Sequence, residues 1–116
     1  MFFALVVQSD AFECTYGDIP NVAADAGDAI EMFKLEDGDW DLLDSEFVDA
    51  AYHVCHALLD YGDIDYLDAR QCALLQGWLD SRLEGSLEPR LRTLYHTLAD
   101  YTQRAQALGT GVVIEL

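Results

Sequence analysis

A long apolar repeat near the C-terminus constrains the fold of this chain more than any other feature. Pro89 is tolerated in the first turn of a helix, and Gly109 suits the position just after its end. Between them the apolar residues recur in alternating steps of four and three, which keeps one helix stripe apolar over about three heptads. No charge code of a coiled-coil dimer accompanies the stripe, so we expect the helix to pack on the protein's own core. The repeat consists of Leu87, Leu91, Leu94, Leu98, Tyr101, Ala105 and Leu108.

The two ends of the chain carry strand signals that can meet in one sheet. Residues 2–8 are rich in aromatic and β-branched side chains, Ser9-Asp10 offers a turn, and residues 11–16 alternate in polarity. Together they predict an N-terminal hairpin. The final residues GVVIEL predict a strand that returns to this hairpin. Three strands with a covered face can be stable, whereas two alone are marginal.

The acidic segment LEDGDWDLLDSE, residues 35–46, is interpreted as a loop between two predicted helices. Gly38 lies inside it and is typical of a break in regular structure. The helix before the segment runs to about Phe33, and the helix after it runs to about Tyr61, because apolar residues recur at helical spacing in both. The capping residues expected for these two helices are Asp18 or Asn21, and Asp44 or Ser45.

A further helix is predicted from about Tyr66 to Leu83, with Asp63 or Asp65 at its start. Its apolar residues spread over more than one side, so we expect it to be the central, most buried helix. Gly77 costs about 1 kcal/mol relative to Ala inside a helix, which favours a close helix crossing there. The sequence therefore predicts an α+β fold. About three antiparallel strands, the N-terminal hairpin plus the C-terminal strand, are packed by about four helices.

The charge of the chain is distributed very unevenly. Its 116 residues suffice for one domain spanning 1–116, and they carry a net charge of −16. Residues 1–69 hold 17 acidic residues and one base, Lys34, whereas residues 70–116 balance five acids with five arginines. Such a field repels nucleic acids and anionic membranes and attracts basic surfaces. The distribution therefore predicts either an acidic surface that aids solubility or a site for a basic partner.

The cysteines and the N-terminus indicate a cytoplasmic protein. Cys14, Cys55 and Cys72 are odd in number and show no CxxC spacing, which favours reduced thiols in small buried positions. The apolar start of the chain is too short for a membrane span and lacks the basic residues of a signal peptide. No nucleophile elbow, P-loop or dinucleotide motif occurs in the sequence. We therefore expect no enzyme activity, no catalytic residue and no cofactor.

One cluster of carboxylates resembles the opening of a calcium loop without completing it. Asp37, Asp39 and Asp41 match its first positions. Leu42 and Val48 then stand where the loop requires a glycine and a bidentate glutamate. No metal site is predicted there.

A second cluster combines histidines with carboxylates. His53 and His56, framed by Asp49 and Asp60, are expected on one side of the predicted helix, opposite its apolar stripe. Imidazole and carboxylate can bind zinc, but a bare helix surface offers no pocket. A solvated polar surface is the expected role, with zinc binding left open. Neighbouring acids favour protonated histidine, so this surface is expected to lose negative charge as pH falls.

Two segments that combine aromatic and acidic residues form the candidate partner-binding site. Trp40 lies among the carboxylates of residues 35–46, and Tyr61 and Tyr66 lie in a second acid-rich segment. Acids speed the encounter with a basic partner, and the aromatic ring supplies a buried anchor. The alternative is that Trp40 folds back into the core. The candidate residues are Asp37, Asp39, Trp40, Asp41, Asp44, Asp60, Asp63 and Asp65.

The leading functional hypothesis is a small acidic inhibitor that neutralises a basic protein, in the form of an immunity protein against a nuclease-type toxin. A close variant is a nucleic-acid mimic, such as a phage inhibitor of a DNA-binding enzyme. From another class comes a structural or regulatory subunit whose long helix or sheet edge builds an oligomer, for instance a homodimer. A metal-dependent enzyme is a weaker rival. The inhibitor hypothesis requires the excess carboxylates to share one face, with no direct binding of nucleic acid or membrane.

Overall fold

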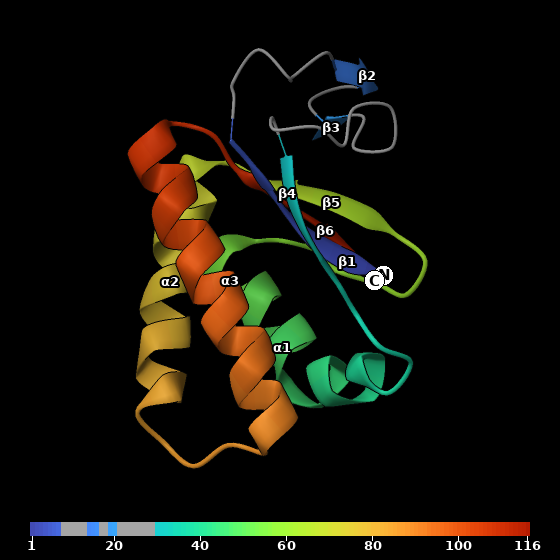
Figure 1. The fold of residues 1–116 in the computed structure, drawn as a ribbon, viewed down its shortest axis with the longest axis vertical. Helices are drawn as coiled ribbons and strands as arrows, with labels where there is room; N and C mark the ends of the chain where they lie inside the picture. Colours follow the sequence, from blue (N-terminus) through green and yellow to red (C-terminus); the bar gives the residue numbers. More distant parts are fainter. Residues whose placement is uncertain (8–13, 17–18, 21–29) are drawn as a thin grey trace.

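The computed structural model describes residues 1–7, 14–16, 19–20 and 30–116, which form an α+β fold (Figure 1). The strands in these ranges are β1 (Phe2–Val6), β2 (Cys14–Tyr16), β3 (Ile19–Pro20), β4 (Ile30–Lys34), β5 (Ile64–Leu67) and β6 (Val112–Glu115). The helices are α1 (Asp39–Cys55), α2 (Ala69–Leu83) and α3 (Pro89–Leu108). The α+β class predicted from the sequence is confirmed, but the described ranges already hold more strands than the three predicted.

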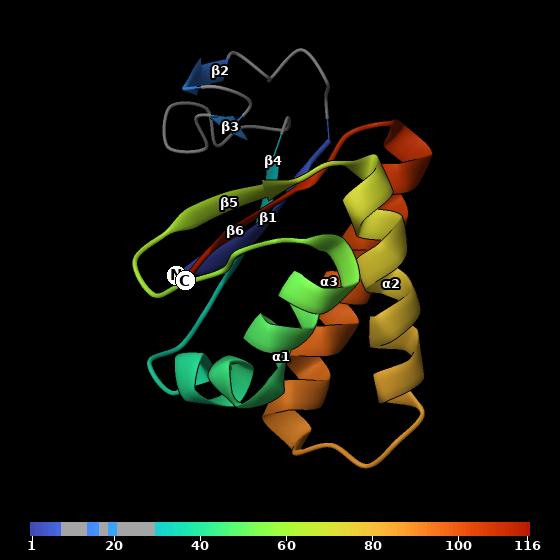
Figure 2. The same ribbon diagram turned by 180° about the vertical axis from the view of Figure 1, so that it is seen from behind.

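Four of the strands form one antiparallel sheet in the order β4-β1-β6-β5, and β2 pairs separately with β3. Figures 1 and 2 show the three helices on one face of this sheet and the β2–β3 pair on the opposite side. β1 is an inner strand because its apolar residues suit burial on both faces, and residues 3–6 are fully buried. β6 lies directly beside β1, which confirms that the C-terminal strand returns to the N-terminal one.

The other neighbour of β1 is β4, where the sequence predicted the end of a helix. Phe33 lies opposite Phe3 in this pairing, and their rings stack with centroids 6.2 Å apart. Cross-strand packing of this kind outweighs the helical spacing around Phe33. The predicted N-terminal hairpin is also wrong, since β2 pairs with β3 rather than with β1. The remaining parts of both predictions fall on residues 8–13, 17–18 and 21–29, which lie outside the described residues.

A strand replaces the predicted start of the helix that follows α1. β5 pairs with β6 at one edge of the sheet, so α2 begins later than expected, at Ala69. Asp68 accepts the backbone N–H of Gln71 at 2.8 Å, and the Gln71 side chain accepts the backbone N–H of Asp68 at 3.1 Å. This capping box is the actual helix start, and the caps predicted at Asp63 or Asp65 are wrong.

The long helix predicted near the C-terminus is confirmed as α3, and its apolar stripe packs inside the protein itself. Glu88 begins the helix by accepting the backbone N–H of Leu91 at 3.0 Å. Gly109 ends it in a left-handed backbone conformation with φ of 70°, which glycine adopts at little cost. The buried apolar positions of the stripe are Leu91, Leu94, Leu98, Tyr101 and Ala105.

α2 is less buried than its sequence suggests. Its buried positions are limited to Cys72, Leu75 and Leu79, and Leu74 is 47% exposed. A Cβ added at Gly77 would meet no atom within 4 Å, so the close helix crossing predicted at this glycine is wrong. α2 packs mainly against α3, which makes α3 the central helix.

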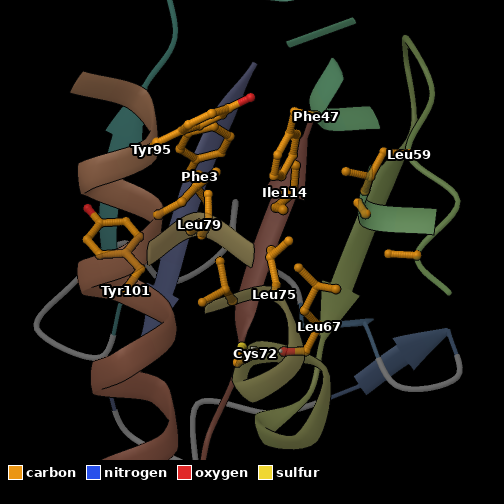
Figure 3. Close-up of a cluster of buried hydrophobic side chains, with 14 of the residues drawn as sticks. Phe3, Phe47, Leu59, Leu67, Cys72, Leu75, Leu79, Tyr95, Tyr101 and Ile114 are labelled. Carbon is orange, nitrogen blue, oxygen red and sulfur yellow. Dashed lines mark hydrogen bonds between the residues drawn. The ribbon is translucent and has the colours of Figure 1, made fainter. Parts of the chain in front are cut away.

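The core lies between the four-stranded sheet and the helices (Figure 3). Phe3 from β1, Phe47 from α1 and Tyr95 from α3 all have fully buried side chains there. Tyr95 donates its hydroxyl to Glu46 Oε1 at 2.8 Å, and Arg82 Nε donates to the same oxygen at 3.1 Å. Because Glu46, Arg82 and Tyr95 come from three different helices, this contact fixes α1, α2 and α3 relative to one another.

Candidate partner-binding surface

The acidic segment 35–46 is mostly helical, and the loop predicted for it is wrong. α1 begins at Asp39, directly after Gly38. Asp39 is only 1% exposed, and its Oδ2 accepts the backbone N–H of Glu36 at 2.8 Å. Arg90 donates through Nε to Oδ1 at 2.9 Å and through Nη2 to Oδ2 at 2.8 Å. This two-pronged hydrogen bond lowers the pKa of the Asp39 carboxyl, so it stays ionised although it is buried.

Arg90 explains why the helix begins earlier than the sequence indicates. Its guanidinium also lies 5.6 Å from the centre of the Phe33 ring, so it contacts the end of β4 as well as the start of α1. Asp39 and Arg90 are 51 residues apart, and no local pattern reveals such a pair. The predicted caps at Asp44 or Ser45 therefore lie inside the helix. Asp39 serves the fold and does not belong to an exposed binding surface.

Trp40 and Tyr61 bring the two predicted acidic segments together. Their rings meet edge to face with centroids 5.4 Å apart. Trp40 is half-buried and packs on the core, as the alternative interpretation expected in part, whereas Tyr61 is 66% exposed. Since Trp40 lies at the start of α1, the segment after α1 must run back along the helix to reach it, as Figures 1 and 2 show. The sequence did not predict this contact.

The carboxylates around this aromatic pair are exposed and lack arginine partners. Among the ion pairs of residues 30–116, the arginines contact Glu31, Glu36, Asp39, Glu46 and Asp100. Of the predicted site, only Asp39 is neutralised in this way. We call the remaining exposed members the outer carboxylates: Asp37, Asp41, Asp44, Asp60 and Asp63.

The turn that carries the second acidic segment is held against the C-terminus. Gly62, with φ of 88°, donates its N–H to the Leu116 carbonyl at 2.7 Å, and Asp63 donates its N–H to the Asp60 carbonyl at 3.1 Å. Asp65, on β5, is half-buried, and burial followed by the charge of Asp63 raises the pKa of its carboxyl. Asp65 is therefore less accessible to a partner than the exposed Asp60 and Asp63, and burial disfavours its charged form.

A groove that the sequence analysis missed lies beside this surface, between α1 and the segment that follows it. Its volume is about 350 Å³. Leu58 is 71% exposed and Tyr52 is 45% exposed, although the apolar spacing predicted a helix that continues through Leu58 to about Tyr61. That prediction is wrong because α1 already ends at Cys55. The residues that line this α1 groove are Asp44, Val48, Asp49, Tyr52, Leu58 and Leu59.

The histidine cluster is split by the end of α1. His53 is on the helix, with Nε2 3.6 Å from Asp49 Oδ1 in an exposed pair. His56 follows the helix in a left-handed backbone conformation with φ of 59°, and Asp60 lies farther along the connection, so the four residues do not share one helix side. Within the described residues no group of three or more His, Cys, Asp or Glu side chains is arranged to hold a metal ion.

The cysteines that the structure describes with their side chains are buried free thiols. Burial raises the pKa of the Cys55 thiol and raises that of Cys72 to about 12, so both are protonated at neutral pH. A protonated, buried thiol is a poor nucleophile and packs as a small apolar group. The predicted burial is thus confirmed for Cys55 and Cys72, while the side chain of Cys14 lies outside the described residues.

No family model, curated protein or solved structure matches this chain. The class of protein is therefore defined by physical features alone. The protein is an α+β domain with an antiparallel sheet, three helices in its described part, and an aromatic pair among exposed carboxylates. None of the helices in the described ranges is both long and apolar enough to cross a membrane.

Proposed function

We propose that this protein is a small acidic inhibitor that binds and neutralises a basic protein in the cytoplasm, as an immunity protein does for a nuclease-type toxin. The contact between Trp40 and Tyr61 supports this proposal most strongly. It gathers carboxylates from two segments around one partly exposed aromatic pair, and such an arrangement suits a surface rich in lysine and arginine.

The arrangement of the arginines strengthens the proposal. Among residues 30–116, Arg82, Arg90 and Arg104 pair with acidic residues on β4, on α1, between them or on α3, and none of these arginines pairs with an outer carboxylate. Nuclease active sites present cationic groups to phosphates, and outer carboxylates can occupy those groups in place of the nucleic acid. The nucleic-acid mimic uses the same chemistry and remains the alternative form of the inhibitor.

One observation weighs against the structural-subunit alternative. The apolar stripe of α3, which this alternative would use to build an oligomer, packs in the core of the same chain. An oligomer would have to use another surface, such as a sheet edge. The outer carboxylates would then serve solubility alone.

The proposal is tested by capturing the partner and assaying its activity. The immobilised protein is exposed to lysate at about 50 mM salt and eluted at about 500 mM, because screening weakens attraction between exposed charges. We expect a cationic nuclease in the eluate whose activity the wild-type protein suppresses. The Asp41→Asn/Asp44→Asn variant should weaken that inhibition roughly tenfold.

The matched control removes two exposed charges elsewhere. Asp80→Asn/Glu84→Gln alters the α2 region by the same net charge and should leave inhibition within about twofold, since these groups lie outside the proposed site. If both variants lost inhibition equally, the loss would follow from the change in net charge and not from the proposed site. A captured protein that remains bound at high salt and tolerates the Asp41→Asn/Asp44→Asn change contradicts the proposed mechanism.

A further inference from the structure

We propose that the α1 groove binds a segment of the basic partner that presents a large apolar side chain between lysine or arginine residues. This inference rests on the proposed function and deepens it, because it specifies what the partner inserts and where. The groove lies beside the outer carboxylates and shares Asp44 with them.

The apolar part of the groove accounts for the inserted side chain. Leu59 is buried, and Val48 packs partly against the core, whereas Tyr52 and Leu58 expose much of their apolar surface along the same groove. Scattered exposed leucines are ordinary in proteins, but apolar side chains that converge on one hollow mark a contact surface. Covering such a surface contributes roughly 25 cal/mol per Å² of apolar area.

The acidic part of the groove decides what kind of segment can enter. Asp44 and Asp49 line the same hollow, and neither has an arginine ion pair among residues 30–116. His53, the group 3.6 Å from Asp49, is itself exposed and can turn away when a partner approaches. A second copy of this chain would bring its own net charge of −16 to these carboxylates and be repelled. Charge complementarity therefore favours a basic segment.

The length of the surface sets the length of the segment. Trp40, Asp44, Val48 and Tyr52 follow one another at four-residue intervals on α1, so they form a stripe that winds slowly around the helix and extends roughly 18 Å along it. An extended peptide covers this distance in about six residues. The aromatic pair formed by Trp40 with Tyr61 lies at one end of this stripe. The complementary segment is thus about six residues long, apolar in the middle and basic at both sides.

Three synthetic peptides of equal length test this inference by NMR titration of the isotope-labelled protein. The first is acetyl-Lys-Arg-Leu-Phe-Arg-Lys-amide. The second replaces the central Leu-Phe by Ser-Ser, and the third keeps Leu-Phe but replaces the four basic residues by serine. We expect the first peptide to bind roughly tenfold more tightly than either control and to shift the signals of Val48, Tyr52 and Leu58.

Two leucine variants at exposed positions supply the matched control. Leu58→Ala should abolish the advantage of the first peptide over the serine-centred one, while Leu108→Ala, at the far end of α3, should preserve it. Both side chains are largely exposed, at 71% and 46%, so neither truncation is expected to unfold the protein.

The outcomes separate this inference from the proposed function. Equal binding of the two basic peptides, with no effect of Leu58→Ala, would show that the α1 groove takes up no apolar side chain. The inference would then be overturned, while the proposed function, which needs only the acidic surface, would stand. Equal binding of the serine-flanked peptide would overturn the basic requirement. Failure of every peptide to bind at low salt would overturn the groove and count against a basic partner altogether. Self-association that Leu58→Ala abolishes would assign the groove to a second copy and overturn the inference.

Discussion

The acidic half of the chain contains two sets of carboxylates that differ in what faces them. The inner carboxylates each contact an arginine from the second half of the chain, and they are Glu31, Glu36, Asp39 and Glu46. The outer carboxylates have no such partner among the described residues. Both sets come from neighbouring positions in the same sequence, so proximity along the chain does not decide which acids are neutralised.

Helix geometry explains the difference. Asp39 and Glu46 are seven residues apart on α1, which places them on the same side as Leu43 and Phe47, facing the other helices. Asp41 points elsewhere on the same helix and stays in solvent. The arginines of α2 and α3 therefore neutralise acids that help to hold the fold, and leave the outward field intact. The carboxylates that contact arginines thus stabilise the fold, whereas the outer carboxylates stay available for the recognition of a basic partner that we propose.

The largest effect should come from removing the cation of the buried inner pair. Arg90→Ala leaves the Asp39 carboxylate, whose side chain is 2% exposed, without its counter-charge. Breaking such a pair from one side costs about 3–5 kcal/mol of unfolding free energy. Asp39→Asn should cost less, because the Arg90 side chain is 28% exposed and can reach water. Chemical denaturation measures the unfolding free energy of both variants, with Arg70→Ala on the exposed start of α2 as the control.

The contribution of the Asp39–Arg90 pair to stability depends on pH. Because the folded-state pKa of Asp39 lies below its unfolded value, the pair stabilises the fold at neutral pH and loses this contribution as pH falls through the lowered pKa. The stability difference between wild type and Asp39→Asn should therefore shrink in acid. A difference that stays constant down to the acid transition would show that the charge of Asp39 does not matter.

A smaller effect is expected at the second inner contact. Glu46→Ala leaves the buried Tyr95 hydroxyl without its acceptor and frees Arg82, which should cost about 1–3 kcal/mol. Adding Tyr95→Phe removes the unsatisfied hydroxyl, so the double variant should recover part of that loss. A double-mutant cycle over these variants measures the coupling free energy between Glu46 and Tyr95. Strict additivity of the two changes in unfolding free energy would mean that their hydrogen bond contributes nothing.

The smallest effect has the opposite sign and concerns a carboxylate between the two sets. Asp65 is half-buried beside Asp63 and forms no ion pair within the described residues, and its raised pKa means that ionisation opposes folding. Asp65→Asn should therefore stabilise the protein at neutral pH, by about 0.5 kcal/mol. The gain should disappear below the unfolded pKa of about 3.9, where wild-type Asp65 is also neutral. Thermal unfolding at both pH values checks this, and destabilisation at neutral pH would reverse the interpretation.

The sequence predicted the arrangement of the candidate surface only in part. Its charge and its aromatic residues are properties of composition and position, and exposure of Asp37, Asp41, Asp44, Asp60 and Asp63 agrees with the expectation of a solvated acidic surface. The burial of Asp39 was missed because its partner Arg90 is remote in the sequence. The α1 groove was missed because it depends on where α1 ends, which moves Leu58 from a helix stripe to an exposed connection.

The sequence by itself determined the elements whose signals are local and long. The apolar stripe of α3 over about three heptads, the apolar runs of β1 and β6, and the charge asymmetry all follow from residues close together in the chain. Only the tertiary structure decided that residues 30–34 and 64–67 are strands and that α1 starts at Asp39. Short segments carry weak intrinsic preferences, so pairing with β1 and β6, and the ion pair with Arg90, outweigh them.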